Sequence, residues 1–399
     1  MQSIGLILEA NPFHNGHKLL IENAKKNFPN ATIISVCSTS FTMRGEISII
    51  NKFDKINLLL DAGVDIVLEL PVSYTLQSAD YFALSTIKIL NDIGITDVIV
   101  GSETTDLTKL AKFYEIIKSD EFKKALKSIN NKESSYKNTI SNVLKLFDVN
   151  CEEINEFNQP NFTLAFQYYT AIKDHNFNIN LHLIKRTTEY YQENDNKTNI
   201  ASASYIRKNY YNKVNINKYL PYIPNFIDLR EAENNLIKIL RFQTLTYPFT
   251  NPFENINGNT EGIGNYILKN GDFANSYQDL LNSLTNKKYS TSRIRRLLLS
   301  QVLGLKNIEF SNISYLRLLG INDRGLKYIN KLPNSIKKLI FSSPNEVSEK
   351  TSIPLVYEIY ATKLYGLLLN DTNYVINEYK LPIRKKDKND ITWTKIITW

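Results

Sequence analysis

Two histidines near the N-terminus, His14 and His17, flank a glycine in the segment His14-Asn15-Gly16-His17. A continuous apolar run at 4–8 precedes them and is too short for a helix, so it predicts a buried strand. Apolar residues after His17 recur at helical spacing, which predicts a helix that begins near Gly16. Such a helix start offers free N–H groups and partial positive charge, and imidazoles beside it can donate to phosphate oxygens. The pattern favours a phosphate site over two histidines that merely cap a helix.

The elements that must position this motif alternate along the first half of the chain. Short buried strands are predicted at 4–8, 31–36, 64–69, 97–100 and 179–184, with amphipathic helices beginning at 17 and spanning 54–62 and 78–90. This alternation predicts the α/β class, with a doubly wound, Rossmann-like parallel sheet. Residues 105–150 predict two or three polar helices inserted before the last strand. Ligands of such sheets bind beyond the carboxyl ends of the strands, and His14, Arg44 and Gly101 all follow strand ends.

The second half of the chain has a different pattern and a different charge. From about residue 211 the alternation stops, and leucine- and isoleucine-rich helical patterns appear, such as 294–303 and 355–369. We therefore predict two domains, an α/β domain over 1–210 and a mainly helical domain over 211–399. Residues 281–399 hold 20 Lys and Arg against 9 Asp and Glu, a balance of +11 that leaves −3 for the rest of a chain of net charge +8. This basic segment favours a polyanion such as RNA as partner, although a solvated basic surface explains the charge equally well.

The composition limits the classes of protein to which this chain can belong. With 399 residues, of which 43% are hydrophobic, the chain can bury a large core and is globular. No run approaches the roughly 18 apolar residues of a membrane span, and no secretory signal pattern opens the chain. Cys37 and Cys151 give neither a disulfide framework nor metal-ligand spacing. We expect a cytoplasmic protein without a membrane segment and without a protein-bound metal.

Three later segments could complete a nucleotide site. Gly101 follows the fourth predicted strand, where a glycine lets an adenine or ribose approach the backbone, although an ordinary strand-ending glycine is an equal alternative. Arg186 follows the fifth strand and can contact phosphate in a bidentate way, with a surface ion pair as the alternative. Ser202 and Ser204 precede an apolar helical start, and Arg207 lies one turn later. This third segment suits terminal phosphates as well as a simple helix cap.

The histidine motif resembles that of the nucleotidyltransferase superfamily, whose members direct attack on the α-phosphate of ATP. The joint pattern of motifs resembles one family more closely, the bacterial tRNA(Met) cytidine acetate ligases. The resemblance is carried by Asn-Pro-Phe-His-Asn-Gly-His at 11–17, Arg-Gly-Glu at 44–46 and the segments 63–71, 77–83, 101–103 and 200–204, with looser matches at 291–299 and 318–322. It covers most of the chain.

The resemblance implies that ATP, with Mg²⁺, and acetate form an acetyl-adenylate that acetylates the wobble cytidine of elongator tRNA(Met). His14 and His17 would be catalytic, and Ser202, Ser204 and Arg207 would bind the terminal phosphates. The family's other ATP contacts fall on Ile7, Leu8, Glu9, Ala10, Asn11, Pro12, Phe13, His14, Asn15, Gly16, His17, Lys18, Leu19, Leu20, Gly101, Asn161 and Arg186. Separately, the positive charge of the second half leads us to place the phosphate contacts of tRNA on Arg293, Arg295 and Arg296, of which Arg293 and Arg296 share a helix face.

This chain departs from the family pattern at Cys37-Ser38, at Met43 and at 187–193. Two other functions stay open from the residues. One is a small-molecule nucleotidyltransferase that makes a cofactor without RNA, and the size and basicity of the second half argue against it. The other is a non-enzymatic RNA-binding protein with a degenerate nucleotide site, and the intact histidine, serine and arginine segments argue against that.

Overall fold

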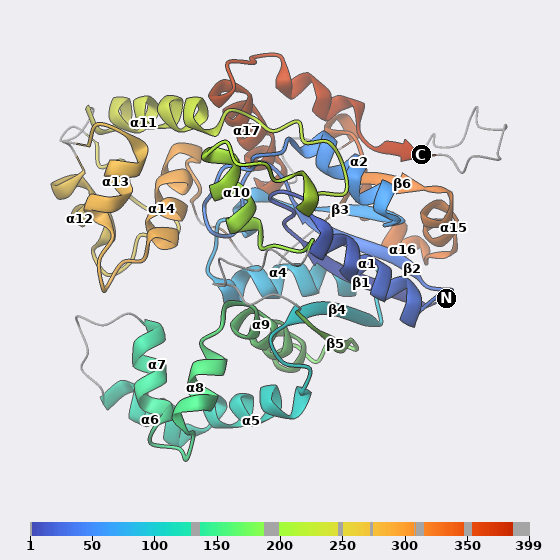
Figure 1. Cartoon of the computed structure of the whole chain (residues 1–399), viewed down its shortest axis with the longest axis horizontal. Coiled ribbons are helices and arrows are strands. Elements are labelled where there is room, and N and C mark those ends of the chain that lie inside the picture. The colour runs from blue at the N-terminus through green and yellow to red at the C-terminus, as the bar shows by residue number, and fades with distance from the viewer. Residues whose placement is uncertain are drawn as a thin grey trace.

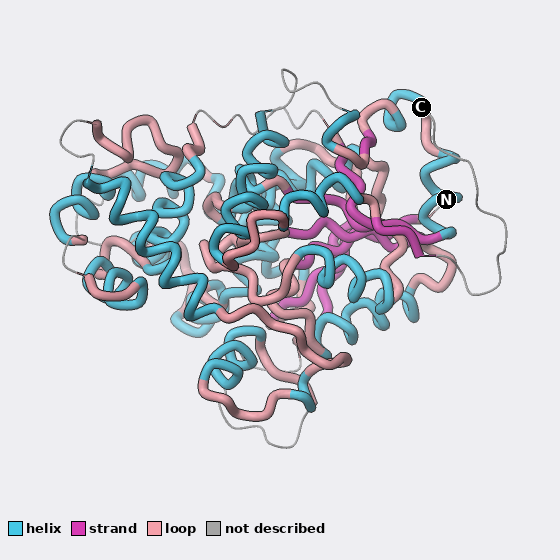
Figure 2. Tube along the Cα trace, turned by 90° about the horizontal axis from the view of Figure 1, so that it is seen from above, coloured by secondary structure: helices cyan, strands magenta, loops and turns pink. Residues whose placement is uncertain are grey.

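The computed structural model describes residues 2–128, 136–186, 199–245, 250–271, 274–306, 308, 315–346 and 353–385. Within these residues, eight strands form one twisted sheet at the centre of the molecule (Figures 1 and 2). The first five are β1 (Ser3–Leu8), β2 (Thr32–Ser38), β3 (Ile66–Leu70), β4 (Asp97–Ser102) and β5 (Asn180–Lys185). They run parallel in the order β5-β4-β1-β2-β3. The five strands predicted from the apolar runs are confirmed, with ends that shift by up to two residues.

Helices cover both faces of this sheet, because neighbouring residues of a strand point to opposite sides. On one face, α1 (Asn15–Asn27) and α2 (Lys52–Ala62) pack on side chains such as Leu6 and Ile33. On the other face, α4 (Ala79–Asp92) and α9 (Pro160–Asp174) pack on side chains such as Ile34. Between α4 and β5 the chain also forms α5 (Leu107–Lys118), α6 (Asp120–Ser128), α7 (Tyr136–Leu144) and α8 (Cys151–Phe157), and α3 (Val72–Thr75) follows β3. The doubly wound α/β arrangement and the helices within 105–150 are confirmed.

The second half is mainly helical, as predicted, and forms a core of its own. Its larger helices are α10 (Ala203–Tyr211), α11 (Leu229–Leu245), α12 (Ile263–Asn270), α13 (Tyr277–Leu284), α14 (Thr291–Leu303) and α17 (Ile353–Leu368). Apolar side chains of α11 to α14 and α17 gather with Phe41 and Ile47, which come from the loop after β2. The helical half is thus built directly onto a loop of the sheet domain (Figure 1).

The second half also extends the sheet, which the sequence did not predict. It adds β6 (Leu316–Asn322), β7 (Ile340–Phe341) and β8 (Ile383–Lys385), with α15 (Asp323–Lys331) and α16 (Asn334–Lys337) between the first two. Because β6 runs antiparallel to β3, the complete sheet is mixed and not wholly parallel. The boundary predicted at residue 211 therefore does not separate the sheet from the rest of the chain. The apolar run of β6 is interrupted by Arg317, so the run lacks the uniform pattern of the other strands.

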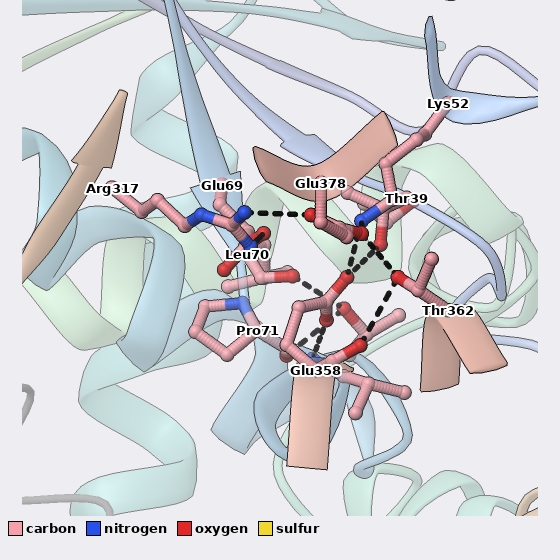
Figure 3. Close-up of polar contacts among 12 residues, drawn as sticks. Thr39, Lys52, Glu69, Leu70, Pro71, Arg317, Glu358, Thr362 and Glu378 are labelled. Atoms are coloured by element: carbon pink, nitrogen blue, oxygen red, sulfur yellow. Dashed lines mark hydrogen bonds and ion pairs between the residues drawn. The ribbon is translucent and has the colours of Figure 1, made fainter. Parts of the chain in front are cut away.

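A buried ion network joins these late segments to the sheet (Figure 3). Lys52 on α2 pairs with Glu358 on α17 at 3.4 Å and with Glu378. Arg317 on β6 pairs with Glu69 on β3 at 2.8 Å and with Glu378 at 2.6 Å. All five side chains are fully buried.

Burial raises the pKa of Glu69 to about 8, despite the attraction of Arg317. Burial would also raise the pKa of Glu378, but Lys52 and Arg317 together lower it to about 2. The two cations therefore hold Glu378 ionised inside the protein. Within the described part of the chain, no helix is both long enough and apolar enough to cross a bilayer.

Candidate functional site

A cavity of about 250 Å³ lies at the carboxyl ends of β1, β4 and β5. Most of the residues predicted to bind ATP line this cavity together. They are Ile7, Leu8, Glu9, Ala10, Asn11, His14, Gly16, His17, Leu19, Leu20, Gly101, Asn161, Arg186, Ser202, Ser204 and Arg207. Parallel strands bring these segments to one edge of the sheet, although up to two hundred residues separate them along the chain.

Both predicted catalytic histidines sit at the start of α1, as the sequence indicates. His14 is the N-cap residue, and its Nδ1 accepts a hydrogen bond from the Gly16 amide at 3.0 Å. The Nδ1 of His17 accepts from the His14 amide at 3.3 Å, and the two rings lie 3.9 Å apart between centroids. A Cβ at Gly16 would lie 2.8 Å from the His14 ring, so a side chain at this position would displace that ring.

The two imidazoles are neutral donors in this arrangement. Burial lowers the pKa of His14 well below its usual range, and His17, Arg186 and Arg207 lower it further. Burial and the neighbouring Arg186 and Lys55 lower the pKa of His17 to about 3. Because each Nδ1 accepts a backbone hydrogen bond, the single proton of each neutral ring is assigned to Nε2. Each histidine therefore keeps one Nε2–H donor for a ligand in the cavity.

Four residues of the predicted ATP segment do not line the cavity. Pro12 and Phe13 are buried, and the Phe13 ring stacks on His17 with centroids 5.7 Å apart. The Asn15 amide donates to the carbonyls of residues 199 and 218, at 2.7 and 3.0 Å. Lys18 is exposed and lies 3.8 Å from Glu22 on the next turn of α1.

One wall of the cavity is rich in cations and hydroxyl groups. Arg186 follows β5, and its aliphatic part lies close to Gly101, where a Cβ would be 3.4 Å from the Arg186 Cγ. Ser202 is the N-cap of α10 and accepts from the Tyr205 amide at 3.2 Å, which leaves its hydroxyl proton as a donor. Arg207 donates to the Asn11 carbonyl at 2.5 Å. The wall offers donors that could hold the terminal phosphates of a nucleotide.

Asn161, at the start of α9, is hydrogen-bonded to Glu103 in the turn that follows β4. Its backbone amide and its side-chain amide both donate to Oε1 of Glu103, at 3.2 and 2.7 Å. The other oxygen of Glu103 is buried and has no hydrogen-bond partner among the described residues. The carboxylate of Glu103 therefore fixes the start of α9 at the cavity. The sequence analysis did not assign this role to Glu103.

The loop after β2 forms another part of the cavity wall, and it contacts the basic helix α14. Glu46 bridges two arginines, accepting from Arg207 at 2.7 Å and from Arg295 at 3.3 Å. Gly45 has a positive φ of 69°, and a Cβ there would lie 2.6 Å from the backbone nitrogen of Arg296. The close approach of α14 to this loop therefore depends on a glycine.

The three arginines predicted to bind RNA lie in different environments. Arg293 is partly exposed, pairs with Glu261 at 2.8 Å and stacks on Tyr289. Arg295 faces Glu46, and Arg296 donates to the Met43 carbonyl at 3.3 Å. Burial lowers the pKa of Arg296 to about 10, so it remains charged at neutral pH. All three arginines are half-buried, and Arg295 and Arg296 connect the basic helix to the cavity wall.

Sequence reasoning did not single out several other residues of the cavity. Thr42 and Tyr168 line it, as do Arg44 and Glu46 of the Arg-Gly-Glu motif, to which the sequence analysis assigned no role in the site. The ion pairs of Glu46 could not be predicted from the sequence, because its partners lie 161 and 249 residues away.

Two of the departures from the family pattern lie at the end of β2, at Cys37-Ser38, and in the loop that follows it, at Met43. Met43 makes its polar contacts through the backbone, whose amide donates to Glu9 at 2.6 Å. Cys37 is buried in β2, and burial raises the pKa of its thiol to about 11. Ser38 donates to Glu9 at 3.4 Å. The third departure, at 187–193, lies outside the described residues.

Known proteins match this chain along nearly its whole length. The family model for HIGH Nucleotidyl Transferase matches residues 1–379. The tRNA(Met) cytidine acetate ligase of Thermoanaerobacter sp. (strain X514) is 31% identical, over 96% of this chain and 100% of its own length. That of Listeria monocytogenes serovar 1/2a is 33% identical, over 96% of this chain and 99% of its own.

Solved structures agree with these matches. The crystal structure of Thermotoga maritima TmcAL bound with alpha-thio ATP is 25% identical, with a TM-score of 0.81. The apo form of TmcAL is 26% identical, with a TM-score of 0.84, and each comparison covers 97% of this chain and 100% of the other. The chain belongs to the tRNA(Met) cytidine acetate ligase family of HIGH nucleotidyl transferases.

Proposed function

We propose that this protein uses ATP and acetate to acetylate the wobble cytidine of elongator tRNA(Met), giving N(4)-acetylcytidine. The observation that carries the proposal is the cavity in which the histidine motif, Arg186 and the Ser202–Arg207 segment converge. The names of the relatives, tRNA(Met) cytidine acetate ligase, and the ATP analogue bound by TmcAL support it. In the first step an acetate oxygen attacks the α-phosphorus, and pyrophosphate leaves.

The residues of the cavity suit this first step. His14 and His17 would donate Nε2–H groups to the α-phosphate as negative charge builds on its oxygens. Preorganised donors of this kind are a large source of rate enhancement in such transfers. Arg186, Ser202, Ser204 and Arg207 would hold the leaving pyrophosphate. Arg207 can contact both Glu46 and a phosphate, because its guanidinium has five N–H donors.

In this scheme the protein supplies neither a base to activate acetate nor a dedicated set of side-chain ligands for Mg²⁺. Acetate is already an anion at neutral pH, so no general base is needed to activate it. Among the described residues, no group of three His, Cys, Asp or Glu side chains is placed to hold a metal ion. We therefore expect Mg²⁺ to arrive with ATP, held mainly by phosphate oxygens and water.

Labelled ATP tests the reaction type. With acetate present, we expect label from the α-phosphate in AMP once tRNA is added, and label from the β- and γ-phosphates in pyrophosphate. Cleavage into ADP and orthophosphate would contradict the proposal and the role of the Ser202–Arg207 segment. Mass spectrometry of nucleosides from the reacted tRNA should show acetylcytidine. A small molecule that accepts the adenylyl group in the absence of tRNA would instead support the cofactor-making alternative.

Two arginines of α14 give a prediction about tRNA binding. Arg293→Gln should weaken the binding of tRNA(Met) and reduce the slope of log affinity against log salt by about 0.7–0.9, because one phosphate contact is lost. The formation of acetyl-adenylate should not change.

Arg296→Gln should also slow adenylate formation, because Arg296 supports the loop of Met43 and Glu46.

Titration of labelled tRNA at several salt concentrations, together with pyrophosphate release, measures both effects. Unchanged affinity and slope in Arg293→Gln would place the RNA surface elsewhere. Unchanged pyrophosphate release in Arg296→Gln would show that the contact with the loop does not support the site.

A further inference from the structure

We propose that Glu9 is the base that accepts the proton of the cytidine amine in the second step, in which the amine attacks the acetyl-adenylate. This inference rests on the proposed function, because the first step alone needs no base. The exocyclic amine must lose a proton once its nitrogen bonds to the acetyl carbon, so a proton acceptor near the acyl group would speed the step. A carboxylate on the wall of the cavity is suited to this role.

Glu9 is placed at the cavity with one oxygen fixed and one available. It directly follows β1 and lines the cavity five residues before His14. Its Oε1 accepts from the Met43 amide at 2.6 Å and from the Ser38 hydroxyl at 3.4 Å. No hydrogen bond within the described chain reaches its Oε2. The backbone therefore orients the carboxylate and leaves an oxygen that can accept a proton.

The other titratable groups that line the cavity are less suited. Glu46 is the only other carboxylate among the lining residues, and both of its oxygens are held by arginines. His14 and His17 use Nδ1 to accept backbone hydrogen bonds, and their remaining nitrogens carry protons. Glu103 lies behind Asn161 and does not line the cavity.

Glu9 also lies on the side of the cavity that leads to the basic half of the protein. Its partner Met43 belongs to the loop that contacts Arg296 of α14 through the Met43 carbonyl. The phosphate-binding wall with Arg186 and Ser202 belongs to the segments after β5. The two parts of the wall meet where Arg207 pairs with Glu46 at 2.7 Å. A cytidine carried on RNA bound along α14 would then reach the acyl group from the Glu9 side.

The surroundings of Glu9 tune its proton affinity. Burial raises the pKa of this carboxyl above its usual range, and the nearby Glu46 raises it further. The Met43 amide, Arg44 and Lys55 act in the opposite direction. The phenol of Tyr168 on α9 and the thiol of Cys37 on β2 also face it, and both hold their protons because burial raises their pKa values.

The proposed step balances as follows. The cytidine N4 lone pair forms a bond to the acetyl carbon, and the bond between that carbon and the phosphate oxygen of AMP breaks. AMP leaves with the electron pair of that bond as its phosphate charge. One N4 proton passes to Oε2 of Glu9, and water removes it after the products leave. The products are acetylated tRNA, AMP and one proton.

Glu9→Gln tests the role, because glutamine keeps an oxygen for the Met43 amide but cannot accept the proton. Supplying synthetic acetyl-adenylate and tRNA(Met) in a single turnover isolates the second step. We expect the transfer rate to fall about 10²–10⁴-fold, as for the loss of a general base. Because Glu9 also belongs to the predicted ATP contacts, acetate-dependent exchange of pyrophosphate into ATP, which reports the first step, should fall far less than the transfer rate. Glu22→Gln, on the exposed side of α1, is the matched control and should transfer acetate like the wild type.

The pH profile separates a base from a structural role. The wild-type transfer rate should rise with pH as Glu9 loses its proton and then level off, whereas Glu9→Gln should lack this rise. Equal transfer rates and equal profiles in both proteins would overturn the proposal. A parallel loss of exchange and transfer would overturn it too, because Glu9 would then serve the first step or the fold. If the wild type exchanges pyrophosphate but never acetylates tRNA, the proposed function itself fails.

Discussion

Replacing His17 with alanine is expected to slow acetate-dependent pyrophosphate release about 10²–10³-fold, as the loss of one preorganised donor to a reacting oxyanion does elsewhere. The physical reason is that the neutral ring offers a single Nε2–H, since its Nδ1 accepts from the His14 amide. His14→Asn should have an effect of the same order. Asparagine is the better replacement at this position, because it can still accept from the Gly16 amide and cap α1.

His182→Ala is the control for these variants. His182 lies on β5, pairs with Asp97 at 2.8 Å and does not line the cavity. Its removal should leave pyrophosphate release unchanged, and circular dichroism should show that all three variants are folded. Release at the wild-type rate from both His14→Asn and His17→Ala would remove the histidines from the mechanism.

Lys52→Met is expected to lower the free energy of unfolding by about 3–5 kcal/mol, as the removal of one partner from a buried ion pair does. Methionine can fill the space of the lysine chain, but it leaves Glu358 without its cation and Glu378 with only Arg317 (Figure 3). Since Glu358 also accepts from the Val72 amide at 2.8 Å, the loss should loosen α17 from the end of β3. Urea unfolding monitored by circular dichroism measures the change.

Lys123→Met provides the comparison on the surface. Lys123 lies 3.4 Å from Asp120 on α6, and both side chains are exposed, so its removal should cost no more than about 1 kcal/mol. If Lys52→Met is no less stable than Lys123→Met, the buried network does not hold the two halves of the protein together.

Much of the α/β half was determined locally, and for that reason could be predicted. The strands β1 to β4 are short apolar runs of the kind that buried parallel strands show, and β5, at the edge of the sheet, is apolar at alternate positions. The start of α1 was predictable because His14 and Gly16 interact within one turn of chain. The carboxyl ends of parallel strands meet at one edge, so the sequence also predicted that Gly101 and Arg186 would join the histidines.

Long-range contacts decided the rest. β6 was missed because Arg317 interrupts its apolar run, and the partners that make a buried arginine tolerable, Glu69 and Glu378, lie 248 and 61 residues away. The ion pair between Glu46 on the cavity wall and Arg295 on α14 joins two residues that are 249 positions apart in the sequence. Arg293 and Arg296 share a helix face in sequence terms, yet Arg293 pairs with Glu261 whereas Arg296 donates to the Met43 carbonyl.

The sequence by itself determined the strands, the histidine motif and the edge of the sheet where the cavity lies, because each depends on residues that are neighbours in the chain or on the geometry of parallel strands. Only the tertiary structure decided which charges are buried, which oxygen of Glu9 is available and how α14 meets the cavity. Those properties depend on the distance and dielectric between groups that are far apart in sequence, and only the packed chain sets both.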